Sequence, residues 1–326
     1  MEKLIENFAE QMKTALEIGE AYSFKTSPKQ FANVVICGLG GSGIGGSLIK
    51  DATINEINIP VNTVNGYFLP AFAGEGSLII ISSYSGNTEE ALHCLEEALK
   101  RNATICAITS NGKVKELSQK HGFDCIFIPG GNPPRSTLGL SATQLLYILN
   151  YFELISDTFK SDLRKTIHLI SAERDNIKKI ANELAQGISN KIPVLYSSDH
   201  IESVTIRWRQ QINENGKQLC WHHVLPEMNH NELVGWRDKN EDLAVVFLRN
   251  DNDFAKVAKR MDLNKEVYKT CTPHIYEIWS KGESFLERAI YLIHLGDWLT
   301  LYLSHLRGYD TTEVNVIDRL KANLAE

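Results

Sequence analysis

The sequence has no apolar run that approaches the roughly 18 residues needed to span a bilayer. It also has no basic excess, because Lys and Arg total 34 against 40 Asp and Glu, a net charge of -6. General binding to the phosphate backbone of a nucleic acid needs a dense basic face, and this balance argues against it. We therefore expect neither a membrane nor a nucleic acid as a partner.

Cysteine is scarce, and no two cysteines form a Cys-x-x-Cys pair. The six are Cys37, Cys94, Cys106, Cys125, Cys220 and Cys271. Most lie inside apolar runs, which favours buried, reduced thiols over disulfides or metal ligands. The N-terminal residues are acidic and amphipathic and lack a signal-peptide pattern, so we expect a cytoplasmic protein.

Strand-like and helix-like segments alternate along the chain, which predicts an α/β fold with parallel sheets. Strands are expected at 33–37, 77–82, 104–108, 124–128, 193–198, 243–248 and 274–278. Helices are expected at 1–21, 89–101, 138–187, 200–213 and 285–306. This order predicts two doubly wound subdomains, 1–155 and 156–326, each a parallel sheet flanked by helices.

A glycine-rich loop follows the first strand and opens a helix. It contains Gly38-x-Gly40-x-x-Gly43, a spacing that lets backbone N–H groups approach a phosphate at a helix N-terminus. A dinucleotide site also needs an acidic residue at the end of the next strand, and the candidate strand 61–66 ends without one. A phosphate site that is not a dinucleotide site is the better prediction.

The strand at 77–82 leads into Ser83-Tyr84-Ser85-Gly86-Asn87-Thr88, ahead of a helix. One alternative is a plain helix cap, made by Thr88 or Asn87. A cap needs only one hydroxyl, however, and three beside a glycine loop favour a neutral phosphate pocket at the carboxyl ends of adjacent strands. The Ser-x-Ser-Gly-Asn-Thr-Glu segment resembles that of the sugar isomerase (SIS) fold. The residues that the resemblance implies for the phosphate are Gly41, Ser42, Ser83, Ser85 and Thr88.

Three polar segments elsewhere carry candidates for chemistry. Pro133-Pro134-Arg135 is stiffened by its prolines and would hold a guanidinium near the strand ends, unless Arg135 is a solvated surface residue. Glu214 and His230 are sixteen residues apart, and a carboxylate with an imidazole can move protons at neutral pH. The cluster His222, His223, Glu227 and His230 also permits a metal site, but its spacing matches no clean ligand pattern.

Together these segments resemble the bifunctional phosphoglucose/phosphomannose isomerases of the phosphoglucose isomerase superfamily. The matching pieces are Gly-Gly-Ser-Gly (40–43), Ser-x-Ser-Gly-Asn-Thr (83–88), Pro-Pro-Arg (133–135), Asn-Glu-Asn-Gly-Lys (213–217), Asn-His-Asn-Glu (229–232) and Ile-x-x-Leu-Lys (317–321). The resemblance implies that Glu214 is the catalytic base and His230 opens the sugar ring. It implies that Arg135 and Lys321 provide charge.

The function that the resemblance implies is interconversion of glucose 6-phosphate, and also of mannose 6-phosphate, with fructose 6-phosphate. Such a proton transfer needs no redox cofactor, and we expect no metal. A homodimer is also implied, with His230 reaching the partner's site. Two alternatives remain open at this point: an isomerase for another phosphosugar, and a regulatory SIS protein that binds a sugar phosphate without turnover.

Overall fold

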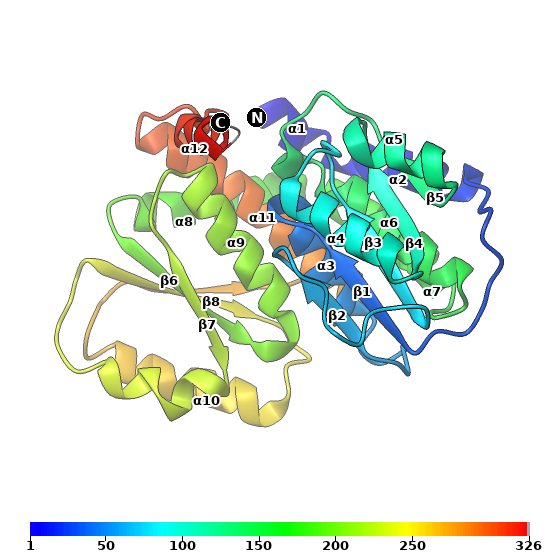
Figure 1. Ribbon diagram of the computed structural model, residues 1–326. Helices are drawn as coiled ribbons and strands as arrows, with labels where there is room; N and C mark the ends of the chain where they lie inside the picture. Colours follow the sequence, from blue (N-terminus) through cyan, green and yellow to red (C-terminus); the bar gives the residue numbers. More distant parts are fainter. Residues whose placement is uncertain (325–326) are drawn as a thin grey trace. The chain divides into compact units, whose positions relative to one another are not determined.

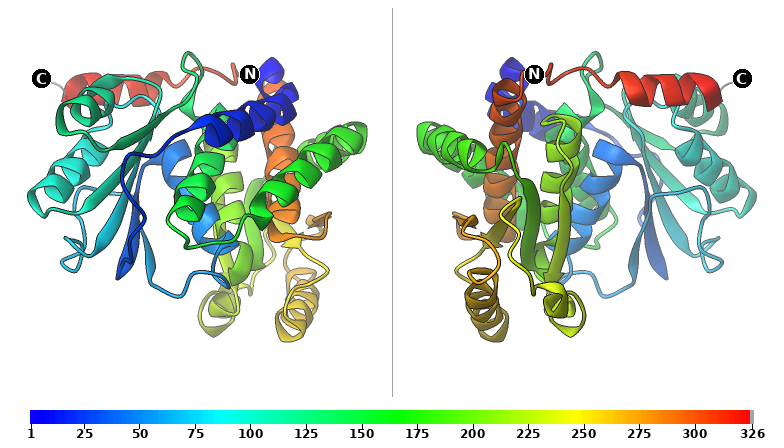
Figure 2. Two further views of the ribbon diagram at one scale, coloured as in Figure 1. Left: turned by 90° about the vertical axis from the view of Figure 1, so that its right-hand side faces the viewer. Right: turned by 90° about the vertical axis from the view of Figure 1, so that its left-hand side faces the viewer.

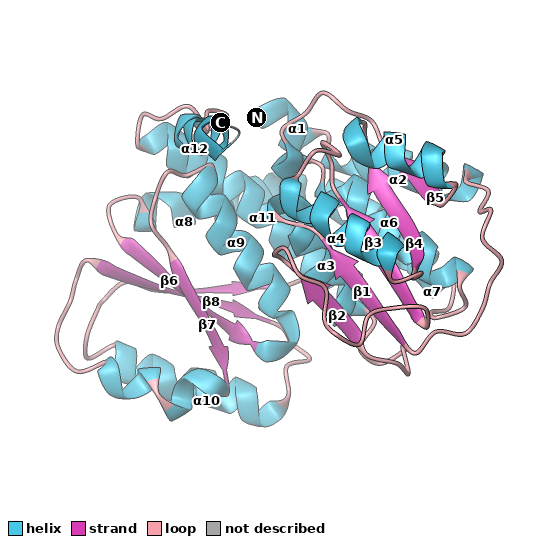
Figure 3. Cartoon of the chain, in the orientation of Figure 1, coloured by secondary structure: helices cyan, strands magenta, loops and turns pink. Residues whose placement is uncertain are grey.

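The computed structural model describes residues 1–324 and contains two parallel sheets, each flanked by helices (Figures 1 and 3). The predicted α/β fold class is thereby confirmed. The chain forms two compact units. The N-terminal unit comprises Glu6–Ser171 with Ser284–Glu287, and the C-terminal unit comprises Met1–Ile5, Ala172–Glu283 and the chain from Arg288 onward. The subdomain boundary that we predicted after residue 155 lies between helices α6 and α7 and stays a prediction.

The sheet of the N-terminal unit has the strand order β2-β1-β3-β4-β5, with every neighbouring pair parallel. Its strands are β1 (Asn33–Cys37), β2 (Val61–Val64), β3 (Ser77–Ser82), β4 (Thr104–Thr109) and β5 (Asp124–Phe127). Its helices are α2 (Phe8–Ala21), α3 (Gly40–Ala52), α4 (Glu89–Lys100), α5 (Gly112–His121), the 3-10 turn η1 (Pro134–Ser136), α6 (Leu138–Tyr151) and α7 (Thr158–Ala172).

The central strands are buried on both faces, which is why they are continuous apolar runs rather than alternating ones. Val35 and Ile79 belong to the core beneath α4 and α5. Ile36 points the other way, where α3 comes so close that a β-carbon on Gly46 would stand 2.8 Å from its Cγ2. The strand order reverses between β1 and β3, so right-handed crossovers place α3 and α4 on opposite faces.

The sheet of the C-terminal unit has the order β7-β6-β8-β9 and is also entirely parallel. Its strands are β6 (Ile192–Ser198), β7 (Trp221–Leu225), β8 (Leu243–Arg249) and β9 (Ile275–Trp279). Its helical elements are α8 (Arg174–Ile188), η2 (Asp199–Ile201), α9 (Glu202–Glu214), η3 (Glu227–His230), η4 (Glu232–Gly235), α10 (Ala255–Tyr268), α11 (Phe285–Leu306) and α12 (Asn315–Leu324). The short α1 (Glu2–Glu6) opens the chain. Figure 2 shows α12 in red, at the end of an extended connection from α11.

The expectations about the cysteines and about a membrane-spanning segment can be compared with the structure. All six cysteines are buried and free, as expected for reduced thiols. Within residues 1–324, no helix combines the length and the apolar character that crossing a membrane requires.

Candidate active site

The glycine loop and the serine loop lie side by side at the carboxyl edge of the N-terminal sheet. This follows from the direct pairing of β1 with β3, which sets Cys37 opposite Ile81 at the last positions of the ladder. Both connections leave their strands at the place where the strand order reverses. In open α/β sheets this reversal opens a crevice beyond the carboxyl ends of the strands, where ligands bind.

The two loops are joined by their hydroxyl groups. The Oγ of Ser42, in the first turn of α3, accepts a hydrogen bond of 3.2 Å from the backbone N–H of Tyr84. The Oγ of Ser83 donates to the Oγ1 of Thr88 over 3.2 Å. Ser42 and Ser83 are buried, Thr88 is half-buried and Ser85 is exposed, with its Oγ accepting from the N–H of Asn87. A hydroxyl at the start of α3 thus bonds the backbone of the serine loop, and the hydroxyls of that loop lie just before α4.

The alternative of a plain helix cap is not what the loop forms. Thr88 occupies the N-cap position of α4, but its side chain makes no capping hydrogen bond. The amide oxygen of Asn87 instead accepts from the backbone N–H of Lys113, at 3.0 Å. The first turns of α3 and α4 both start without a side-chain cap. A phosphate is the kind of anion that such N–H groups and neighbouring hydroxyls bind.

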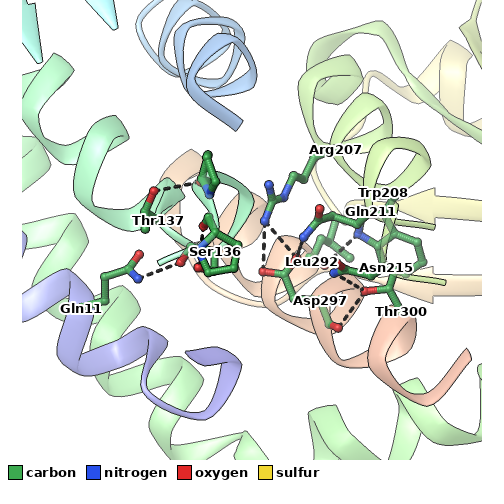
Figure 4. Close-up of polar contacts among 12 residues, drawn as sticks. Gln11, Ser136, Thr137, Arg207, Trp208, Gln211, Asn215, Leu292, Asp297 and Thr300 are labelled. Atoms are coloured by element: carbon green, nitrogen blue, oxygen red, sulfur yellow. Dashed lines mark hydrogen bonds and ion pairs between the residues drawn. The ribbon is translucent and has the colours of Figure 1, made fainter. Parts of the chain in front are cut away.

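Arg135 belongs to the same edge of the same unit, because η1 packs against the start of α3. A β-carbon on Gly41 would stand 2.9 Å from the carbonyl oxygen of Pro134 and 3.1 Å from the Cα of Arg135. The turn is held from the other side by Gln11 of α2, whose Nε2 donates to the carbonyl of Ser136 at 2.8 Å (Figure 4). Arg135 is only 4% exposed, so the alternative of a solvated surface arginine is wrong.

The Asn-Glu-Asn-Gly-Lys segment (213–217) forms the end of α9 and the turn that follows it in the C-terminal unit. Glu214 is the last residue of the helix and is half-buried. Asn215 is fully buried, and its Nδ2 donates to the Oγ1 of Thr300 at 3.1 Å. A β-carbon on Gly216 would come within 2.7 Å of the carbonyl of Ile212. The Nζ of Lys217, a residue with φ of 52°, donates to the carbonyl of Glu214 at 2.7 Å.

The structure does not bring Glu214 and His230 together within the C-terminal unit. Helix α9 runs back along the sheet from the carboxyl end of β6, and its 13 residues span about 20 Å. Glu214 therefore lies at the amino edge, where the nearby Gln218 donates to the carbonyl of Ile188 at 2.9 Å. His230 ends η3, just beyond the carboxyl end of β7, and is exposed. Glu214 and His230, sixteen residues apart in the sequence, therefore lie at opposite edges of the sheet.

Lys321 is an exposed residue of α12. The connection into this helix is fixed near Glu214, because the Nζ of Lys217 donates to the carbonyl of Glu313 and lies 3.5 Å from the Oε1 of its carboxylate. Lys321 follows Glu313 by eight residues. Glu214 and the start of α12 thus share the amino edge of the C-terminal sheet.

A carboxylate–imidazole pair that sequence reasoning missed lies near His230. The Nδ1 of His223 in β7 is 2.9 Å from the Oε2 of Glu232, whose other oxygen accepts from the hydroxyl of Tyr196. His222 points elsewhere, 3.9 Å from Glu202, and burial lowers the pKa of His222 to about 4. No group of three or more His, Cys, Asp and Glu side chains within residues 1–324 is arranged to hold a metal ion.

Comparisons with known proteins show the family. A family model described as the bacterial phospho-glucose isomerase C-terminal SIS domain matches residues 177–324. A bifunctional phosphoglucose/phosphomannose isomerase of Caldicellulosiruptor bescii is 39% identical, over 98% of this chain and 97% of that protein. The chain belongs to the bifunctional phosphoglucose/phosphomannose isomerase family. A protein of the same name from Aquifex aeolicus is 35% identical, over 90% of this chain and 91% of its own length.

Solved structures extend the likeness of the fold well beyond this family. The C-terminal domain of glucosamine-fructose-6-phosphate aminotransferase from Francisella tularensis superposes with a TM-score of 0.77. The match covers 95% of this chain and 97% of that one at 15% identity, and it therefore bears on the fold alone. The family resemblance and the class of enzyme predicted from the sequence, an aldose–ketose isomerase, are confirmed. The roles of individual residues stay predictions.

Proposed function

We propose that this protein interconverts glucose 6-phosphate and mannose 6-phosphate with fructose 6-phosphate. The observation that carries the proposal is the group of hydroxyls and uncapped helix starts around Ser42, Ser83 and Thr88, with Arg135 beside it, in a chain of this isomerase family. The pocket binds the substrate's phosphate through Gly41, Ser42, Ser83, Ser85 and Thr88. The serine loop and the strand before it supply no side-chain cation, since no Lys or Arg occurs between residues 51 and 99.

In the proposed reaction, Glu214 moves a proton between C2 and C1 of the open-chain sugar. Its carboxylate removes the C2 proton of the aldose, and the bonding electrons form a cis-enediolate. The same proton returns to C1 while the proton of the O2 hydroxyl passes to O1, which gives the ketose. Arg135 stabilises the charge that develops on the enediolate oxygens. A fixed guanidinium lowers the free energy of the transition state most where negative charge develops. Lys321 adds positive charge. His230 transfers the proton that opens the cyclic sugar before this step.

We further propose that the active protein is a homodimer in which His230 completes the site of the partner subunit. The placement of Glu214 and His230 at opposite edges of one sheet supports this arrangement, because a single unit separates them by about 20 Å. Hydrogen-bond reach is about 3 Å, so the two side chains cannot serve one sugar from within the same C-terminal unit.

A hybrid dimer tests this arrangement. Glu214→Gln and His230→Asn subunits, each inactive alone, are mixed and allowed to exchange. If each site takes Glu214 from one subunit and His230 from the other, every hybrid has one intact site, and random exchange restores about a quarter of wild-type activity. No recovery in a mixture that is shown to contain hybrids would contradict the proposal.

The activity itself is tested by incubating the protein with fructose 6-phosphate and following both aldose phosphates. Formation of glucose 6-phosphate and mannose 6-phosphate, retained after exhaustive dialysis against a chelator, supports the proposal. Binding without turnover would instead indicate a regulatory sugar-phosphate protein, and turnover of a phosphosugar of another chain length would indicate a different isomerase. The six buried, free thiols support a reducing compartment, and we propose the cytoplasm.

A further inference from the structure

The buried face of α9 carries a row of polar side chains that bind α11 (Figure 4). The Nη2 of Arg207 lies 3.1 Å and 3.4 Å from the two carboxylate oxygens of Asp297. The Nε2 of Gln211 donates to the Oδ1 of the same carboxylate at 2.9 Å. Arg207, Gln211 and Asp297 are 2%, 3% and 7% exposed, so this ion pair is inside the protein.

The row continues beyond the end of the helix, at Asn215. The Oγ1 of Thr300 accepts from the Nδ2 of Asn215 at 3.1 Å and donates to the carbonyl of Asp297 at 2.9 Å. Asn215 and Thr300 are both fully buried. Asp297 and Thr300, one turn apart on α11, therefore hold the residues three before and one after Glu214.

A contribution to stability does not by itself explain why these buried positions are polar. Burying an ion pair costs several kcal/mol of desolvation per ion, and well-packed apolar residues of similar volume often serve stability as well or better. Hydrogen bonds in a buried polar network do, however, fix directions, which apolar contacts do not. The row also has close packing beside it, since the Nε1 of Trp208 donates to the carbonyl of Leu292 and a β-carbon on Gly296 would meet that ring at 2.5 Å.

We propose that Asp297 and Thr300 are positioning residues that fix the end of α9 and with it the carboxylate of Glu214. The inference rests on the proposed role of Glu214 as the base. A proton transfer between C1 and C2 depends on the direction of the carboxylate, and a displacement of about 1 Å costs up to about 10²-fold in rate. The phosphate-binding residues lie on other elements, so substrate affinity does not depend on this row.

Thr300 gives the cleanest test, because Asp297→Asn removes a carboxylate from the buried Arg207 and endangers folding. Thr300→Val removes the hydroxyl and keeps the shape. We expect its kcat for fructose 6-phosphate to fall by about tenfold or more while KM stays within about twofold. Thr300→Ser restores the hydroxyl, and we expect its kcat within about threefold of wild type.

The control is Thr205→Val, on the same helix. Thr205 is also fully buried, and its hydroxyl donates to the Oγ of Ser197 at 2.6 Å and to the carbonyl of Ile201 at 3.4 Å. It lies nine residues, or about 13 Å, before Glu214. Denaturant unfolding of Thr300→Val and Thr205→Val measures how much stability each substitution removes. We expect Thr205→Val to keep its kcat. Equal kcat losses in the two valine variants would overturn the proposal, since a general loss of packing would then explain both.

A double-mutant cycle separates this inference from the proposed function. In a Glu214→Gln background, Thr300→Val should lower the residual kcat no further, because the group that it positions is gone. Nearly full activity of Glu214→Gln would contradict the proposed role of Glu214 as the base, on which this inference rests. A collapse in Glu214→Gln together with unchanged kcat in Thr300→Val would overturn only the positioning role.

Discussion

The carbonyl oxygen of Pro134 lies 2.9 Å from the place where a β-carbon on Gly41 would stand. This contact sets the turn that carries Arg135 directly against the first turn of α3. Gly41 therefore meets two requirements. Its backbone leaves room for the phosphate in the proposed site, and it allows the turn of Arg135 to approach α3 closely. Both requirements exclude a side chain.

Gly41→Ala should consequently displace the turn of Arg135 or the start of α3. We expect a loss of activity of about tenfold or more, from misplacement of groups that must act together. Gly45→Ala, in the same helix, is the matched control, because its β-carbon would meet only side-chain atoms at 3.5 Å or more. Steady-state kinetics on both variants make the comparison, and equal activities would contradict the close approach at Gly41.

Removal of hydroxyls from the phosphate pocket should weaken substrate binding more than turnover. A hydrogen bond to a charged group is worth about 1.5 to 3 kcal/mol, so Ser83→Ala and Thr88→Val should each raise KM about tenfold or more. The value of kcat should change little, because the phosphate takes no part in the C1–C2 transfer. Ser118→Ala removes a buried hydroxyl of α5 that donates to the carbonyl of Lys115 in the same helix, and should leave KM unchanged. A fall in kcat at constant KM would assign Ser83 and Thr88 to another role.

His294 should make the protein less stable in acid. Burial, followed by the charges of Lys178 and Arg174, lowers the pKa of His294 from 6.5 to about 4. The folded state therefore favours the neutral ring, and its stabilisation is present above pH 6.5 and lost as the pH falls from 6.5 toward 4.

The pH dependence of unfolding in a His294→Gln variant measures this effect. Between pH 7.5 and 4.5, wild type should lose about 2 to 3 kcal/mol more of its free energy of unfolding than the variant. The glutamine side chain offers an acceptor for the Nε1 of Trp298, which donates to the Nε2 of His294 at 3.2 Å. Parallel stability curves for the two proteins would show that His294 does not titrate across this range.

The strands and helices that the sequence predicted well are those whose residues are buried on all sides. The apolar runs at 33–37 and 77–82 match β1 and β3 residue for residue, and 285–306 matches α11. Strand β7 was missed because it is an edge strand that begins with the half-exposed Trp221-His222-His223. A helix around Lys321 was expected but not its bounds, since α12 has no buried residue to mark them.

The grouping of the proposed phosphate-binding hydroxyls was predictable, because one local segment, the serine loop, supplies most of them. The separation of Glu214 and His230 was not, because spacing along the chain does not say at which edge of a sheet each residue emerges. The partnership of His223 with Glu232 depends on the fold of η4 over β7, for which the sequence has no local signal. The rigid turn that carries Arg135 was predictable, since two prolines precede this residue.

The most direct test of the account is the turnover of Glu214→Gln. The substitution keeps the size of the side chain and a hydrogen-bonding oxygen but removes the basic carboxylate. Loss of a general base costs about 10²-fold to 10⁴-fold in rate, so kcat should collapse by that factor for fructose 6-phosphate and for both aldose phosphates. A competitive phosphosugar inhibitor should bind the variant nearly as tightly as it binds wild type. A variant that keeps more than about a tenth of wild-type turnover would contradict the role of Glu214.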